Sequence, residues 1–257
     1  QVFNFVPSLI DQIQDYTSEK ASDRFLGLSY KKAEDLTPEE QDFLWHNFFM
    51  VDMERIISLF PRYYELFLKK NQKQKFSTQD FRDLQVWFNL AWFDPSFRNS
   101  IPQLRDLNFK GRFYSEEEKI SVLKAQIDIL RKIIPTYQQF LKTEQIEITT
   151  TPYYHPILPL LYDTKIAKET IYKVVLPAKR FAYPEDAKWQ VEAAVKHSQD
   201  IFGIAPEGMW PAEEAVSEHI IPFIINAGIK WMVCDEAILF KSLKKRKRDP
   251  ALLYQPF

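Results

Sequence analysis

Short strand-like segments alternate with longer helical stretches along this chain, and this alternation limits its fold more than any other feature. The strand-like segments lie near residues 2–6, 146–151, 202–206 and 230–234, where apolar or β-branched side chains gather. Strands that are separated by helices pair in parallel, because each helix returns the chain to the same side of the sheet. The sequence therefore predicts an α/β protein built on one parallel sheet.

One long helical block without a convincing strand is predicted between residues 10 and 143. Capping sequences open its helices at Thr37, from which a helix is predicted toward Leu59, at Ser77 and at Ser115. Pro135 is expected to kink or split the last of these helices, because proline cannot donate a backbone hydrogen bond. After the block, two further helices are predicted at 184–202 and 217–227.

Polar and aromatic clusters follow three of the predicted strands. They are the segments 152–156 (PYYHP), 207–214 (EGMWPAEE) and 235–236 (DE). In an α/β barrel the C-terminal ends of the strands carry the active site, so these clusters are expected to converge. Two carboxylates in an aromatic cleft suit glycoside hydrolysis, in which one attacks the sugar carbon and the other protonates the leaving oxygen.

The same residues also allow structural interpretations. Glu207 and Glu214 could be acids at a helix N-terminus, which is the favoured role for Glu214. His155 could be a hydrogen-bonded wall residue, and Asp235 could cap the following helix. A zinc site could use the same side chains, but His155 has no partner in an HxxxH or HExxH pattern.

Several other classes of protein are disfavoured. With five glycines and no GxGxxG or GxxxxGKS motif, the chain lacks a nucleotide-cradling loop. There is no GxSxG elbow, and Cys234 is expected to be an inert thiol within a strand. The net charge is −1, and the basic run 241–248 is interpreted as a solvated surface, so no nucleic-acid partner is expected. No segment suits a membrane span, and the single cysteine favours a reducing, cytoplasmic location.

Three longer motifs carry a resemblance to a known family. The segments 149–161 (TTTPYYHPILPLL), 208–213 (GMWPAE) and 231–236 (WMVCDE) resemble glycoside hydrolase family 57, and the likeness runs along the whole chain. This family includes α-amylases, amylopullulanases, 4-α-glucanotransferases and branching enzymes, and the chain looks closest to the amylopullulanase-like branch. The resemblance implies an incomplete, TIM-like (β/α)7 barrel and a retaining mechanism on α-glucans without a cofactor.

The resemblance also implies roles for single residues. The family nucleophile is the glutamate of a Trp-x-x-Glu turn, which corresponds to Glu213, with Trp210 as a wall of the −1 sugar site. The other candidate sugar contacts are His155, Tyr154, Trp92, Asp235 and Glu236, and no metal ligand is assigned. Prolines in this turn are expected to stiffen it, since a small misplacement of a catalytic group costs rate.

Two family motifs are missing from the chain. The family's His-Gln-Pro motif is expected upstream of Gln1, and the acid aspartate is expected beyond Phe257. Residues 1–257 are thus expected to form part of a catalytic barrel, truncated at both ends, with a helical insertion at about 10–143, and to be inactive alone. Two alternatives stay open: a non-catalytic glucan-binding or assembly module, and a metal-dependent deacetylase or mannosidase on a related barrel.

Overall fold

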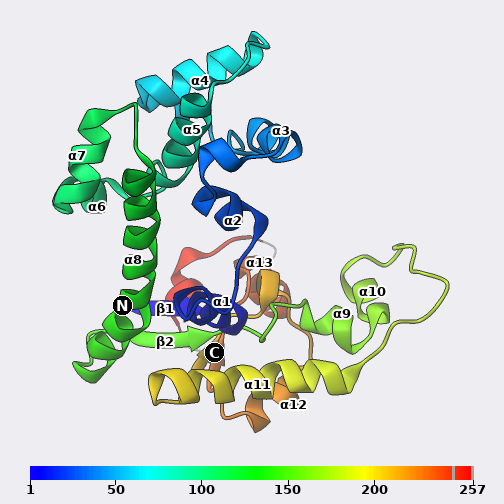
Figure 1. Cartoon of the computed structure of the whole chain (residues 1–257). Helices are drawn as coiled ribbons and strands as arrows, with labels where there is room; N and C mark the ends of the chain where they lie inside the picture. The colour runs from blue at the N-terminus through cyan, green and yellow to red at the C-terminus, as the bar shows by residue number, and fades with distance from the viewer. Residues whose placement is uncertain (245–246, 256–257) are drawn as a thin grey trace. The chain divides into compact units, whose positions relative to one another are not determined.

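The computed structural model describes residues 1–244 and 247–255, and the chain divides into two compact units (Figure 1). Unit 1 comprises Gln1–Gln14 and Ile133–Phe257, and unit 2 comprises Asp15–Lys132. The basic run at 241–248 lies partly outside the described residues.

Unit 2 is helical in its described residues and has one large apolar core. Ser77 caps α5 with a reciprocal pair of hydrogen bonds to Asp80, as its sequence predicts, and Trp87 and Leu90 of the same helix are buried in the core. The helices are α2 (Arg24–Tyr30), α3 (Pro38–Asn47), α4 (Pro61–Asn71), α5 (Thr78–Leu90), α6 (Pro95–Ser100), α7 (Pro102–Lys110) and most of α8 (Glu116–Lys142).

Two predictions in this block need correction. The helix that Thr37 caps ends at Asn47 rather than near Leu59, and a new helix starts at Pro61. Proline is well suited to the first turn of a helix, because the N–H that it lacks would have no partner there. Pro135, in contrast, does not split its helix, because α8 continues through it as one helix of 27 residues, and the alternative of a kink at Pro135 stays a prediction.

Unit 1 contains a parallel sheet with the strand order β1-β2-β3-β4, four strands among the described residues. Asn4 of β1 pairs with Thr149 of β2, Thr150 pairs with Met209 of β3, and Met209 pairs with Met232 of β4. Its elements are β1 (Val2–Phe5), α1 (Pro7–Thr17, of which residues after Gln14 belong to unit 2), β2 (Glu147–Thr150), α9 (Leu158–Tyr162), α10 (Ala167–Thr170), α11 (Pro184–Phe202), β3 (Gly208–Met209), α12 (Ile221–Asn226), β4 (Trp231–Met232) and α13 (Glu236–Ser242).

The strand predicted at 202–206 is wrong in its position. Helix α11 continues to Phe202, and Gly203 closes it in the left-handed conformation with φ of 79°. The pairing with β2 begins only after Pro206, so β3 is Gly208–Met209 and Glu207 precedes the strand instead of following it. The helix predicted from Ser217 likewise starts later, at Ile221, with proline in its first turn.

The α/β class and the parallel pairing predicted from the sequence are confirmed. Met209 and Ile224 lie in one apolar cluster of unit 1, and Ile148 and Phe202 lie in another, so the sheet is packed against helices. Within the described residues, no helix combines the length and apolar character that a membrane crossing requires.

Candidate active site

The turn that follows β3 is tied to the sheet on both sides. The backbone N–H of Trp210 donates to the carbonyl of Thr150 at 2.8 Å, and the N–H of Val233 donates to the carbonyl of Met209 at 3.1 Å. Gly208 is required here, because a Cβ at this position would lie 2.3 Å from the indole of Trp231. The sheet therefore fixes where the turn begins.

The turn itself has an unusual backbone. Glu213 and Glu214, within a short 3-10 turn (Ala212–Glu214), both adopt left-handed conformations, with φ of 53° and 57°. Non-glycine residues seldom adopt this conformation, and it is concentrated at functional sites because the surrounding structure must compensate for its cost. Pro211 restricts the approach to the turn and accepts a hydrogen bond from the N–H of Glu214 at 2.9 Å.

A hollow of about 340 Å³ lies beside this turn and is lined by Asn4, His155, Trp210, Glu213 and Glu214. These residues come from β1, from the loop after β2 and from the turn after β3. Thr149 donates a side-chain hydrogen bond to the amide oxygen of Asn4 at 3.0 Å, next to the hollow. The structure thus gathers three of the predicted site residues, His155, Trp210 and Glu213, around one cavity at the C-terminal edge of the sheet.

The loop that carries His155 is held by two helices of unit 1. The Tyr153 hydroxyl donates to the carboxylate of Asp11 in α1 at 2.5 Å, and the other oxygen of Asp11 lies 2.7 Å from Nε2 of His197 in α11. Burial, followed by the hydrogen bond and charge of Asp11, raises the pKa of Tyr153 to about 12, so its hydroxyl stays a donor. Gln190 in α11 holds the loop as well, because its side-chain oxygen accepts a hydrogen bond from the backbone N–H of Tyr154 at 2.8 Å.

Within this loop, the backbone of His155 adopts a left-handed conformation with φ of 56°. Its N–H donates to the carbonyl of Pro152 at 2.9 Å, which closes a tight turn. The loop is thus constrained by side chains and by its backbone, which fixes the backbone of His155 where its side chain lines the hollow.

The remaining predicted contacts lie elsewhere. Tyr154 is 64% exposed and stacks on Trp189, with ring centroids 6.1 Å apart. Asp235 caps α13 by accepting from the N–H of Ala237 at 2.7 Å, and Glu236 forms an ion pair with Arg248. Neither acid lines the hollow among the described residues, nor does Tyr154.

Trp92 belongs to unit 2, where it follows α5 and is 58% exposed. It lines a groove formed within that unit. Its role as a sugar contact remains a prediction, as do those of Tyr154, Asp235 and Glu236.

Two residues that line the hollow were not among the predicted contacts. Asn4 is the one polar residue inside the apolar strand 2–6, and this isolated polarity is a signal that could have identified it. Glu214 was assigned to a helix N-terminus, but no α-helix begins there. The structure shows that it lines the same hollow as Glu213.

Cys234 lies beyond β4 and is exposed, which corrects its predicted place within the strand. Although the residue is exposed, partial burial of its sulfur first, and then the negative charges of Glu214 and Asp235, raise the pKa of its thiol. A raised pKa disfavours the thiolate and therefore nucleophilic catalysis by this cysteine.

No cluster of three or more His, Cys, Asp or Glu side chains suited to a metal ion is found in residues 1–244 and 247–255. The three-ligand sets typical of catalytic zinc are thus not assembled by the described side chains alone.

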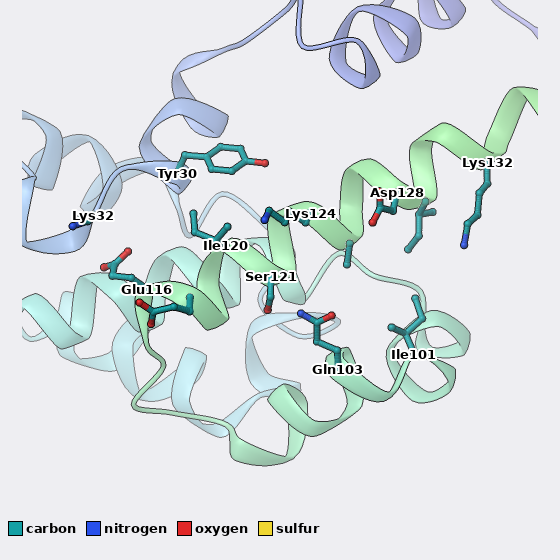
Figure 2. A pocket seen from close by; sticks show the side chains of 13 residues that line it. Tyr30, Lys32, Ile101, Gln103, Glu116, Ile120, Ser121, Lys124, Asp128 and Lys132 are labelled. Carbon is teal, nitrogen blue, oxygen red and sulfur yellow. The ribbon is translucent and has the colours of Figure 1, made fainter.

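A larger cavity, of about 840 Å³, lies within unit 2 along α8 (Figure 2). Its charged lining mixes both signs, with Lys124 and Lys132 beside Asp128. Glu116 at one end accepts hydrogen bonds from Arg82 at 2.7 Å and from the backbone N–H of Ala33 at 3.0 Å. No tryptophan lines this cavity, whereas the hollow of unit 1 has both the indole of Trp210 and the exposed carboxylate of Glu213.

The hollow offers a defined set of chemical groups. Glu213 provides an exposed carboxylate, Trp210 an indole that is 42% exposed, and His155 and Asn4 provide hydrogen-bonding groups for hydroxyls. An aromatic face next to a carboxylate suits a sugar ring, whose C–H groups pack on the indole while its anomeric carbon meets the acid.

Comparisons with known proteins place the chain in a family. The sequence profile of glycosyl hydrolase family 57 matches residues 13–256. Alpha-amylase 1 from Dictyoglomus thermophilum is 31% identical over 115 residues, which cover 43% of this chain and 14% of the amylase. The crystal structure of the alpha-amylase AmyC from Thermotoga maritima matches with 13% identity and a TM-score of 0.33, over 78% of this chain and 36% of that one. The chain thus matches only a part of the length of both relatives.

Proposed function

Because this chain belongs to glycosyl hydrolase family 57, we propose that it forms part of a retaining enzyme that acts on α-glucans, with Glu213 as the nucleophile. The observation that carries this proposal is the turn after β3, where Trp210 and Glu213 line one hollow and the sheet fixes the start of the turn. The relative from Dictyoglomus thermophilum named above is an alpha-amylase, which supports an α-glucan as the substrate class.

In the proposed first step, a carboxylate oxygen of Glu213 forms a bond to the anomeric carbon of a glucosyl unit. The glycosidic carbon–oxygen bond breaks, and the departing oxygen takes a proton from a carboxylic acid. In the second step, a water molecule or a sugar hydroxyl attacks the same carbon, and the bond to Glu213 breaks. The attacking group gives its proton to the carboxylate that the acid became in the first step. Water gives hydrolysis, whereas a sugar hydroxyl gives transglycosylation.

Other groups of the hollow are assigned to substrate binding. Trp210 supports the face of the sugar in the −1 site, and His155 and Asn4 bind its hydroxyls. The backbone of His155 is already constrained, so the loop loses little further freedom when substrate binds, and this favours affinity. Asp235 acts mainly as a helix cap under this proposal, and its charge contributes at longer range.

We also propose that the four-stranded sheet is part of an incomplete (β/α)7 barrel in which residues at about 10–143 form a helical insertion. The acid that protonates the leaving oxygen then comes from a part of the enzyme outside these 257 residues. The isolated chain is accordingly expected to bind α-glucans without turning them over.

Kinetics of the longer parent enzyme test the proposal. With maltoheptaose as substrate, Glu213→Gln should lower kcat at least about a thousandfold, as the removal of a catalytic nucleophile does. Glu207→Gln is the matched control, because Glu207 precedes β3, pairs with Lys230 and does not line the hollow. Near-normal turnover by Glu213→Gln would overturn the assignment, and glucan binding without turnover by the parent would favour a non-catalytic module.

A further inference from the structure

An aromatic groove of about 560 Å³ lies wholly within unit 2. Its exposed rings are Trp92, Phe25 and Phe97, from three separate segments of the unit. Phe25 stacks against Phe88, with ring centroids 5.7 Å apart, so its plane is fixed by the core. The volume is in the range of about 300–1,000 Å³ that is usual for sites of small ligands.

The polar groups of this groove are what distinguish it from an apolar docking surface. Asn89 is only 8% exposed, and its side-chain nitrogen donates to the carbonyl of Gln85 at 2.8 Å and to the hydroxyl of Ser29 at 2.9 Å. A backbone carbonyl can only accept, so these bonds fix the amide orientation. No described residue donates to the remaining amide oxygen of Asn89, although this side chain lines the groove.

Two further polar groups of the groove have no hydrogen-bond partner among the described residues. Gln126 donates to the backbone carbonyl of Asn89 at 3.2 Å, which leaves its own side-chain oxygen as a free acceptor among the described residues. The indole nitrogen of Trp92, likewise, has no acceptor in the described part of the chain. The groove therefore combines aromatic faces with two amide acceptors and one indole donor, beside the carboxylates of Asp23 and Asp94, which accept from backbone N–H groups of α2 and α6.

We infer that this groove binds a stretch of α-glucan, an inference that rests on the proposed function. A sugar has apolar C–H faces that pack on aromatic rings and hydroxyls that both donate and accept hydrogen bonds. An apolar helix in the same place would bury the oxygens of Asn89 and Gln126 without partners, which costs free energy. The polar lining thus favours a glucan over a hydrophobic partner.

The effect of single side chains on maltoheptaose binding tests this inference in the 257-residue chain. Trp92→Ala should weaken binding about tenfold, since it removes a stacking ring. Gln126→Leu should weaken binding about threefold to tenfold through the loss of one acceptor, while keeping the groove filled. Phe109→Ala is the matched control, because Phe109 is an aromatic side chain of unit 2 that is 81% exposed and lies outside the groove.

Hydroxyl-radical footprinting with mass spectrometry locates the bound sugar and complements titration calorimetry. Saturating maltoheptaose should protect the peptide that contains Trp92 and leave the peptide that contains Phe109 unprotected. No protection of Trp92, or equal affinities of Trp92→Ala and Phe109→Ala, would overturn the inference. So would unchanged or tighter maltoheptaose binding by Gln126→Leu, because the acceptor on Gln126 would then contribute nothing to sugar binding.

The two proposals fail in different ways. If maltoheptaose protects Trp92 in the 257-residue chain, but the parent enzyme keeps full activity after Glu213→Gln, the groove is supported and the catalytic assignment is contradicted. Loss of activity in the parent after Glu213→Gln, together with unchanged glucan binding by Trp92→Ala, would support the nucleophile and contradict the groove.

Discussion

The backbone at Glu213 and Glu214 links local strain to the proposed chemistry. Two consecutive left-handed residues cost an L-amino-acid chain about 1–2 kcal/mol each. Pro211 and the hydrogen bonds of the sheet hold the turn in this form, which directs the Glu213 side chain into the hollow. A relaxed turn would avoid the cost and lose this geometry.

Replacement of Glu214 by glycine measures the strain at the residue scale. Glycine adopts φ near 57° without a Cβ clash, so Glu214→Gly should raise the free energy of unfolding by up to about 1 kcal/mol. The control Glu192→Gly, within helix α11, should lower it by about 1 kcal/mol. Urea unfolding of the two variants makes the comparison, and a Glu214→Gly protein as destabilised as Glu192→Gly would contradict the strain assigned to this turn.

At the scale of elements, the loop after β2 depends on its attachment to α1 and α11. Asp11 is the shared acceptor for Tyr153 and His197, so its loss frees two side chains at once. In the parent enzyme, Asp11→Asn should raise KM for maltoheptaose about tenfold through the looser position of His155. Its effect on kcat should be smaller, because Glu213 is held by a different turn.

Steady-state kinetics separate this positioning role from general destabilisation. Tyr153→Phe should shift KM in the same direction, since it removes the same hydrogen bond from the other partner. Asp15→Asn, at an exposed position of α1, should change neither constant. A fall in kcat with an unchanged KM for Asp11→Asn would contradict the account of the loop.

The elements also show what the sequence could and could not predict. Capping sequences such as Ser77 to Asp80 encode their own helix start, and β-branched residues at 147–150 encode a strand, because both signals are local. The two-residue strand β3 has no such signal. Its position depends on pairing with Thr150 and Trp231, which lie far away in sequence, and local composition alone therefore placed the strand too early.

The site was predictable to the same extent. A motif resemblance predicted Trp210, Glu213 and His155, which line one hollow, whereas the place of Asn4 there follows from the register of β1 against β2. Asp235 belongs to another of the three family-like segments, 231–236, but its side chain caps a helix in the described structure. Spatial convergence of strand ends, and not spacing along the chain, decides which polar residues meet.

At the scale of the whole molecule, stability in acid should depend on a buried charge network in unit 2. Burial alone would raise the pKa of Asp80, but hydrogen bonds from Lys69, Ser77 and Arg62 outweigh it and lower the pKa to about 2. A carboxyl whose folded pKa lies below its unfolded value stabilises the protein above that unfolded value. This contribution, about 2 kcal/mol, should be lost as the pH falls from about 4 toward 2.

Urea unfolding between pH 7 and pH 2.5 measures this dependence. The wild-type chain should lose stability steeply at the acidic end, and Asp80→Asn should be less stable at pH 7 with a flatter acid dependence. Asp106→Asn, at an exposed position of α7, should follow the wild-type curve. An Asp80→Asn curve parallel to the wild-type curve would contradict the assigned role of Asp80.

The central claim, that Glu213 is the nucleophile of a retaining α-glucan enzyme, is tested most directly by trapping the glycosyl-enzyme. An α-maltosyl fluoride has a good leaving group and little need of an acid, so it can glycosylate the nucleophile even where the second step is slow. Peptide mass mapping of the treated parent enzyme and of the 257-residue chain should then find the added sugar on Glu213, and Glu213→Gln should abolish the label. A label on Glu207, Glu214 or Asp235 that persists in Glu213→Gln would contradict the assignment.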